Sequence, residues 1–273
     1  MSSNNTFLAN SSFSTNHFFT PFEESIDSYA IPARFTFPFD YEPHPLCILA
    51  TQKLQSYLET QQDLNHNFGL SKVDGAIIGK MFGVLVVETQ DGEIGYLSAF
   101  SGKLAGENHH TGFVPPIFDG TEDGGFVNIG MLELSRISRE IKELEINSQE
   151  DVNEVIEVLK SYRKAFSISL QNEIFDQYHF LNKNGEEMSL RKIFEKAAYK
   201  NPPAGAGECA APKLLQYAFG NNMKPLAMAE FWWGLSPKST QWKHRSFYPA
   251  CREKCEPILA HMLEGMDLDE KLQ

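Results

Sequence analysis

The chain has 273 residues, of which 42% are hydrophobic, and a formal net charge of -12 at pH 7. A chain of this length can bury a full hydrophobic core, as one large domain or two small ones. The acidic balance argues against a surface that binds nucleic acids non-specifically, because such surfaces are normally basic.

The cysteines and the first residues of the chain indicate the cellular compartment. There are four cysteines, and the first residues lack the basic and long apolar regions of a secretory signal. Thiols in a reducing compartment serve as ligands, nucleophiles or core residues. No apolar run approaches the roughly 20 residues that a membrane span needs. We therefore expect a soluble, cytoplasmic protein with no membrane contact.

The first hundred residues predict a tail, a helix and a hairpin. Residues 1–20, rich in Ser, Asn and Thr, are expected to be disordered or to lay their phenylalanines on a neighbouring surface. Fourfold spacing of apolar residues predicts a helix over 46–60. Apolar runs at 80–88 and 93–100 predict a hairpin, since the Asp-Gly at 91–92 can take positive φ at both positions. The unbroken apolar run of the first strand indicates that both of its faces are covered.

The middle of the chain changes character. Residues 106–125 read as a glycine-punctuated loop, after which apolar residues return at helical spacing among charges. The stretch 147–151 contains a helix-capping pattern between two such runs. We expect a helical hairpin that continues brokenly to about residue 200, so that 129–200 is an insertion into a smaller core.

The last unit carries the chemistry. We expect a helix over 209–219 with Pro212 in its first turn and Gly220 beyond its end, the usual asymmetry of helix termini. A buried strand over 225–233 and a closing helix over 251–263 follow. Cys209 then starts one helix, while Cys251 and Cys255 share a face of the other.

Three thiols at two helix N-termini predict a zinc site. Zinc prefers sulfur and nitrogen ligands, and a helix N-terminus stabilises the thiolate form. His244 is a candidate fourth ligand or proton donor, and Glu208 is the candidate that would move protons. The alternatives are ordinary: buried thiols that only pack, a surface histidine, and a carboxylate that stabilises a helix start.

The element order is similar to that of zinc-dependent nucleoside and base deaminases. There a hairpin precedes a ligand-bearing helix, and a further strand leads to a helix with a cysteine pair, so that zinc can activate a water. The resemblance implies an α/β, cytidine-deaminase-like mixed sheet with flanking helices. Its core would span 21–128 and 201–265, with a tail over 266–273.

Two positions depart from the deaminase pattern. The family's ligand-x-Glu order requires a glutamate at 211, where this chain has Ala211. The second pair, Cys251 and Cys255, is separated by three residues instead of two. Residues four apart on a helix can still face one ion.

Basic and aromatic residues near the C-terminus are candidates for RNA or substrate contacts. A basic cluster can follow a phosphate backbone, and an aromatic ring can stack on a base. The alternatives are a solvated charged face and a packed ring. The candidates are Lys213, Trp233, Lys238, Lys243 and Arg245.

Longer phrases carry a second resemblance. The chain contains YEPHPLC (41–47), GKMFGVLVV (79–87), GYLSAFSGKLAG (95–106), PAGAGECAAPKLLQYA (203–218), KPLAMAEFWWGLSP (224–237) and YPACREKCEPILAHML (248–263). These phrases resemble the N-terminal extension of long RluA-type RNA pseudouridine synthases, over about residues 40–265. In that family a separate downstream domain supplies the catalytic aspartate from a His-Arg-Leu-Asp motif, which this chain lacks.

The resemblance implies an accessory role. The chain is expected to be a truncated form, a split gene product or a free-standing relative of the extension, and not to make pseudouridine by itself. Its partners would be tRNA or rRNA and a synthase catalytic domain in cis or in trans. The alternatives are a zinc-dependent deaminase or hydrolase acting on a base or nucleoside, and a structural module without metal.

Overall fold

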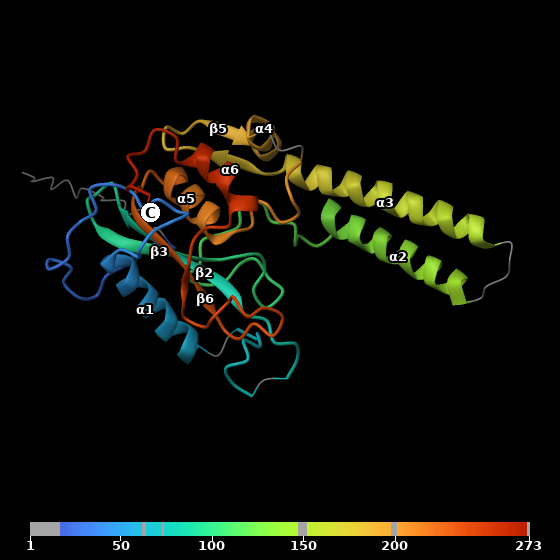
Figure 1. Cartoon of the computed structure of the whole chain (residues 1–273), viewed down its shortest axis with the longest axis horizontal. Helices are drawn as coiled ribbons and strands as arrows, with labels where there is room; N and C mark the ends of the chain where they lie inside the picture. Colours follow the sequence, from blue (N-terminus) through green and yellow to red (C-terminus); the bar gives the residue numbers. More distant parts are fainter. Residues whose placement is uncertain (1–16, 62–63, 73, 147–151, 198–200, 272–273) are drawn as a thin grey trace, which may run out of the picture.

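The computed structural model describes residues 17–61, 64–72, 74–146, 152–197 and 201–271. Its centre is a five-stranded sheet of order β1–β3–β2–β6–β7, drawn in Figure 1. All pairings in this sheet are antiparallel. The α/β class is therefore confirmed, whereas the expected mixed sheet is wrong, because β2 runs antiparallel to both of its neighbours. The strands are β1 Thr20–Pro21, β2 Lys80–Glu88, β3 Ile94–Phe100, β6 Lys224–Trp233 and β7 Phe247–Tyr248.

Helices cover both faces of the sheet. Helix α1 packs on one face, and α5 and α6 pack on the other, as Figure 1 shows. A small sheet of two strands lies beside α5 and α6. These elements are α1 Pro45–Thr60, α2 Phe126–Ile146, α3 Asn153–Asp176, β4 His179–Leu181, β5 Glu187–Ser189, α4 Leu190–Lys196, α5 Ala210–Gly220 and α6 Arg252–Met262.

Strand β2 contributes to two hydrophobic cores. Successive side chains of a strand point to opposite faces. Val84 and Val86 join the core under α1, while Leu85 and Val87 join the core under α5 and α6. All four are fully buried, which confirms that this strand is covered on both faces. Burying each such side chain stabilises the fold by about 1.5–3 kcal/mol.

The turn between β2 and β3 differs from the expected one. The N–H of Thr89 donates to the carbonyl of Glu93 at 2.8 Å, which closes a three-residue loop. Gly92 has a φ of 81°, and Asp91 is not among the residues with positive φ. The loop thus needs one left-handed glycine at its end, as three-residue hairpin loops commonly do.

Residues near both ends of the chain pack on the core. Residues 1–16 of the expected tail lie outside the described part. Phe18 meets Tyr217 with ring centroids 5.4 Å apart, and β1 pairs with β3. At the other end, Leu268 bridges to Phe35, and residues 272–273 lie outside the described part. The described parts of both expected tails are therefore in contact with the fold.

The helices α2 and α3 form the expected hairpin, which projects from the sheet domain in Figure 1. It has a small core of its own, made of Ile137, Ile141 and Ile156. The expected capping stretch 147–151 lies outside the described residues. After the hairpin the chain returns to the main core, to which β4 and α4 contribute Phe180 and Phe194.

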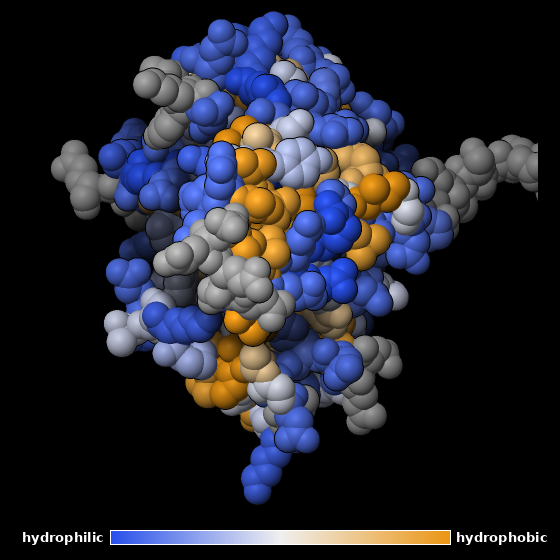
Figure 2. Space-filling model, turned by 90° about the vertical axis from the view of Figure 1, so that its right-hand side faces the viewer, coloured by the Kyte–Doolittle hydropathy of each residue, from blue (hydrophilic) through white to orange (hydrophobic). Residues whose placement is uncertain are grey.

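Apolar side chains are also exposed on the hairpin. Figure 2 looks at the end of the molecule that carries it and shows apolar residues gathered near the middle of that face. The exposed residues include Ile129, Leu132, Ile146, Val155, Val158 and Tyr162. Within the described ranges, no helix combines the length and apolarity required to cross a bilayer.

Candidate functional site

Two helices on the same face of the sheet start at a cysteine. Cys209 is the N-cap of α5 and Cys251 is the N-cap of α6, both with extended backbone. The Sγ of Cys251 accepts a hydrogen bond from the N–H of Lys254 at 3.3 Å, so the sulfur takes the role that a Ser or Asp oxygen usually has. Pro212 stands in the first turn of α5, and Gly220 is its last residue instead of following it.

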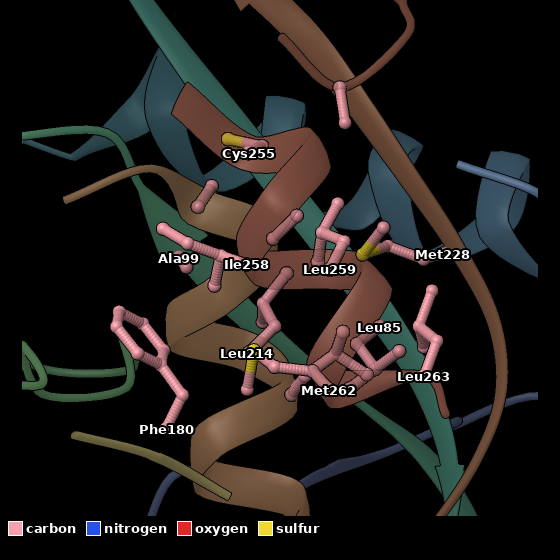
Figure 3. Packing of buried hydrophobic residues seen from close by; sticks show 14 of the residues in the cluster. Leu85, Ala99, Phe180, Leu214, Met228, Cys255, Ile258, Leu259, Met262 and Leu263 are labelled. Carbon is pink, nitrogen blue, oxygen red and sulfur yellow. The ribbon is translucent and has the colours of Figure 1, made fainter. Parts of the chain in front are cut away.

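The three thiols meet. Cys209, Cys251 and Cys255 form side-chain hydrogen bonds with one another, although α5, β6 and β7 lie between Cys209 and Cys251 in the chain. Cys251 is exposed, Cys209 is partly buried and Cys255 is buried. Figure 3 shows Cys255 at the start of α6, above the apolar residues that attach this helix to α5.

The hydrogen bonds order the three thiols by acidity. Those from Cys209 and Cys255 lower the pKa of Cys251 far below its ordinary value, although burial opposes them. The hydrogen bond to Cys251 raises the pKa of Cys209 to about 12, although the hydrogen bond with Cys255 opposes this. Hydrogen bonds to its two partners, and burial, raise the pKa of Cys255. Cys251 is therefore the thiol of the cluster that loses its proton most readily.

The ligand atoms suit zinc, which accepts thiolates readily. In the described part of the chain, no group of three or more His, Cys, Asp or Glu side chains is arranged to hold a metal ion. The thiols share protons instead. A metal would have to replace those protons, as metal binding to thiols generally does. The zinc site therefore stays a prediction.

A buried carboxylate lies beside the thiols. Glu230 on β6 is 4% exposed and accepts a hydrogen bond from the backbone N–H of Ala211. Its own N–H donates to the hydroxyl oxygen of Tyr41, whose O–H donates to the carbonyl of Tyr248. Burial raises the pKa of Glu230 to about 7, opposed by the Ala211 hydrogen bond and assisted by the charge of Cys251.

Sequence reasoning missed Glu230. The sequence does mark this residue, because Glu230 is the only acidic residue of β6 and its neighbours along the strand are apolar. A carboxylate inside a buried strand is rare unless it has a partner. Such a position could have been selected from the sequence as a candidate functional group.

Glycine at position 83 allows α5 to approach the sheet at this site. A Cβ on Gly83 would lie 3.1 Å from the Cβ of Ala210 and 3.1 Å from Cδ1 of Leu214. It would also lie 3.5 Å from Cγ of Glu230. The missing side chain at Gly83 thus sets how closely the first turn of α5, and with it Cys209, approaches Glu230.

The expected proton carrier, Glu208, faces a different group of side chains. The hydroxyl of Tyr178 donates to its Oε1 at 3.5 Å. The charges of Lys80 and Lys213 also act on it, since Glu208 opposes the lowering of both lysine pKa values. The structure therefore places the carboxylate of Glu230 in electrostatic contact with the thiol cluster, while Glu208 interacts with Tyr178, Lys80 and Lys213.

Lys213 is buried, which corrects its expected role as a surface contact for RNA. It is 3% exposed, and its ammonium donates to the carbonyls of Phe100 at 3.0 Å and Gly102 at 3.2 Å. Burial lowers its pKa to about 8, although the charges of Glu208 and Cys209 oppose this. Lys213 holds the turn after β3 against α5.

Trp233 and His244 lie on the other face of the sheet from the thiols. Trp233 is 1% exposed and belongs to the core under α1, so its ring is not available to a base. His244 packs against it with ring centroids 4.4 Å apart, and its Nδ1 accepts the N–H of Gly234 at 3.0 Å. His244 lies on the connection between β6 and β7 and is held against Trp233, on the α1 side of the sheet, whereas the cysteines start the helices on the other side.

The remaining basic candidates lie on the connection between β6 and β7. Lys238, Lys243 and Arg245 are exposed. Arg245 forms an ion pair with Glu59 and lies 5.5 Å from the ring of Trp233. Two exposed lysines on one loop are compatible with RNA contact and with a solvated face.

Comparison with family models, with curated proteins and with solved structures finds no match to this chain.

Proposed function

We propose that this chain is an accessory domain of RNA pseudouridine synthesis, with a deaminase-like core and a zinc ion bound by Cys209, Cys251 and Cys255. The observation that carries the metal centre is the convergence of three thiols from the starts of two helices. The role in RNA modification rests on the phrases that resemble the extension of RluA-type synthases.

The order and pairing of the elements support the deaminase-like core. The β2–β3 hairpin precedes α5, which begins at Cys209, and β6 then pairs with β2. Helix α6 follows with Cys251 and Cys255. The resemblance requires this sequence of hairpin, ligand helix, strand and second ligand helix.

The electrostatics of the thiols support a metal. The backbone N–H groups of Lys254 and Cys255 help to lower the pKa of Cys251, and a helix N-terminus stabilises a thiolate charge. Three protein ligands leave a fourth position on zinc for water or a further ligand. When bound, the ion would lower the pKa of a water in that position.

Metal analysis of the purified chain tests the centre. We expect about one zinc per chain, lost when all three cysteines become serine. The matched control is Cys47→Ala, because Cys47 is a buried residue of α1, in the core on the other face of the sheet, and that variant should retain zinc. A folded, zinc-free wild type that also fails to take up added zinc would contradict the centre.

RNA binding tests the accessory role separately. The chain should bind tRNA or rRNA hairpins, or stimulate a synthase catalytic domain added in trans. Charge reversal at Lys238 and Lys243 should weaken binding in a salt-dependent manner, because contacts to phosphates release counterions. If the zinc-loaded chain does neither, the accessory role fails whether or not zinc is bound.

The position of Glu230 favours a second candidate, a zinc-dependent deaminase or hydrolase acting on a base or nucleoside. In that reaction a carboxylate near the ion moves protons to and from a water. Glu230 lies at the first turn of α5, near the position where the deaminase pattern expects a glutamate.

Ammonia release from a panel of bases and nucleosides tests this candidate. Activity should be lost in Glu230→Gln, because Glu230 is in electrostatic contact with the thiol cluster, and retained in Glu208→Gln, because Glu208 interacts with Tyr178, Lys80 and Lys213. Loss of activity in Glu208→Gln alone would identify Glu208 as the proton carrier, as the sequence analysis expects. Inactivity across the panel, with zinc bound, would favour the accessory role.

A further inference from the structure

A second polar site lies beside Glu208. A cavity of about 90 Å³ opens between the turn after β3, the start of α5 and the base of the α2–α3 hairpin. One wall is apolar and includes Phe118 and Tyr178, whose rings meet at 5.7 Å. Lys213 and Glu208 line the opposite side. This volume suits one small ring rather than an elongated ligand.

Three lysines lie near Glu208: Lys213 lines the cavity, whereas Lys80 and Lys254 lie outside its lining. A Cβ on Gly102 would lie 3.9 Å from Oε2 of Glu208 and 4.0 Å from Nζ of Lys80. A Cβ on Gly205 would lie 3.3 Å from Nζ of Lys254 and 3.6 Å from the same Oε2. Lys213 adds a third ammonium, close enough to Lys80 for their charges to repel.

These cations have no ion-pair partner in the part of the chain that the structure describes. The ion pairs of the described residues involve neither Lys80 nor Lys213 nor Lys254. Lys80 and Lys254 are only partly exposed. In a chain with net charge -12, three such ammonium groups around one carboxylate leave a local positive excess, which attracts anions.

We propose that this site binds a nucleotide unit, with its phosphate on Lys80 and Lys254 and its ring in the cavity against Phe118 and Tyr178. Lysine ammonium groups bind phosphate as point charges, and aromatic rings stack on any base. Glu208 shields the lysines from one another while the site is empty. The nucleotide unit is either a free mononucleotide or part of an RNA strand.

The site adjoins the thiol centre, because the N–H of Lys254 donates to the Sγ of Cys251. It is formed by ammonium groups and an apolar wall, so the proposal needs no metal. Nucleotide binding should therefore persist when all three cysteines are serine. A wild-type chain that binds the nucleotide but no zinc would support this site and contradict the metal centre.

Calorimetric titration at low salt tests the site with four probes: uridine 5′-monophosphate, inorganic phosphate, uridine and a short oligouridylate. We expect the monophosphate to bind more tightly than phosphate or uridine alone. The oligouridylate separates the two sources, since it binds more tightly than the monophosphate only if the unit belongs to RNA. Equal affinity for uridine and its monophosphate would overturn the role of the lysines.

Three variants make the test specific. The double variant Lys80→Gln and Lys254→Gln should bind the monophosphate or the oligouridylate, whichever binds wild type more tightly, about tenfold or more weakly. Each charged hydrogen bond contributes about a factor of ten. The control Lys142→Gln, an exposed lysine on α2, should change nothing. Phe118→Ala should reduce nucleotide binding and leave phosphate binding intact.

The direction in which Glu208→Gln changes the binding affinity distinguishes an anion site from other sites. Removing the one carboxylate among three lysines should tighten nucleotide and phosphate binding, and added salt should reduce that gain. If the variant binds more weakly, or if the lysine pair behaves like the Lys142 control, the proposal is wrong. The proposal also fails if neither the monophosphate nor the oligouridylate binds.

Discussion

The carboxylate of Glu230 on β6 accepts a hydrogen bond from the backbone N–H of Ala211 in the first turn of α5. The deaminase resemblance expects a glutamate at position 211 itself, on the helix. Here a carboxylate reaches the same helix turn from the neighbouring strand. A buried N–H needs an acceptor, and a helix N-terminus favours a negative one. Glu230 therefore has a structural role as well as a candidate chemical one.

We expect Glu230→Ala to lower the free energy of unfolding by about 2–4 kcal/mol, because it leaves the Ala211 N–H without its acceptor and opens a cavity. Glu230→Gln keeps an acceptor oxygen and nearly the same volume, so its change should be much smaller. Urea unfolding of the metal-free chain measures both. Equal losses in the two variants would show that the charge, and not the acceptor, is what the fold requires.

The close approach at Gly83 gives a second prediction. We expect Gly83→Ala to destabilise the fold by about 1–3 kcal/mol, since the new methyl group would press on Ala210 and Leu214. It should also change the thiol cluster, because α5 must move away from β2. Gly220→Ala is the matched control at the other end of α5, where a Cβ meets nothing within 4 Å. A Gly83→Ala protein as stable as wild type, and equally able to take up zinc, would contradict this account.

The long elements of the fold were predictable. The strands β2 and β6 and the helices α1 and α6 lie within about two residues of the ranges expected from hydrophobic periodicity. The strands β4, β5 and β7 have two or three residues each, too few to show a period. Their formation depends on partners that the local sequence does not reveal.

The candidate site was predictable only in part. Helix starts placed Cys209 and Cys251 at one end of neighbouring helices, which is why the structure brings them together. The face on which a side chain lies depends on strand register, which the sequence did not supply. That uncertainty explains the outcome for Trp233 and Glu230 on β6, whereas the place of His244 depends on the path of the connection between β6 and β7.

Alkylation should distinguish the four cysteines. Cys251 is exposed and its pKa is lowered by hydrogen bonds from Cys209 and Cys255, so iodoacetamide should modify it first, already at pH 6. Cys47 is buried and burial raises its pKa, so it should react only on unfolding. Mass spectrometry of the chelator-treated chain gives the rates.

The partners of Cys251 provide the control for that experiment. Changing Cys209 and Cys255 to alanine removes both donors, and labelling of Cys251 at pH 6 should slow. Alanine is preferred to serine because a hydroxyl could still donate. Added zinc should protect Cys251 in the wild type and not in this variant. Labelling that is equally fast with and without the two partners would show that their hydrogen bonds do not stabilise the thiolate.

Lys213 should make stability depend on pH in the alkaline range. Its pKa is lowered from 10.5 to about 8 in the folded chain, chiefly by burial. Between these values the unfolded chain binds more protons than the folded one, so stability rises as the pH increases from about 8 to 10.5. The difference in unfolding free energy between wild type and Lys213→Met should therefore grow by on the order of 3 kcal/mol across that range.

Taking the difference cancels the titration of tyrosines and cysteines that both proteins share. Urea unfolding at pH 7.5, 8.5 and 9.5 measures it, with the exposed Lys142→Met as a variant whose difference stays flat. A flat difference for Lys213→Met would mean that its amine is fully protonated in the folded chain and that burial at the turn after β3 does not weaken its charge.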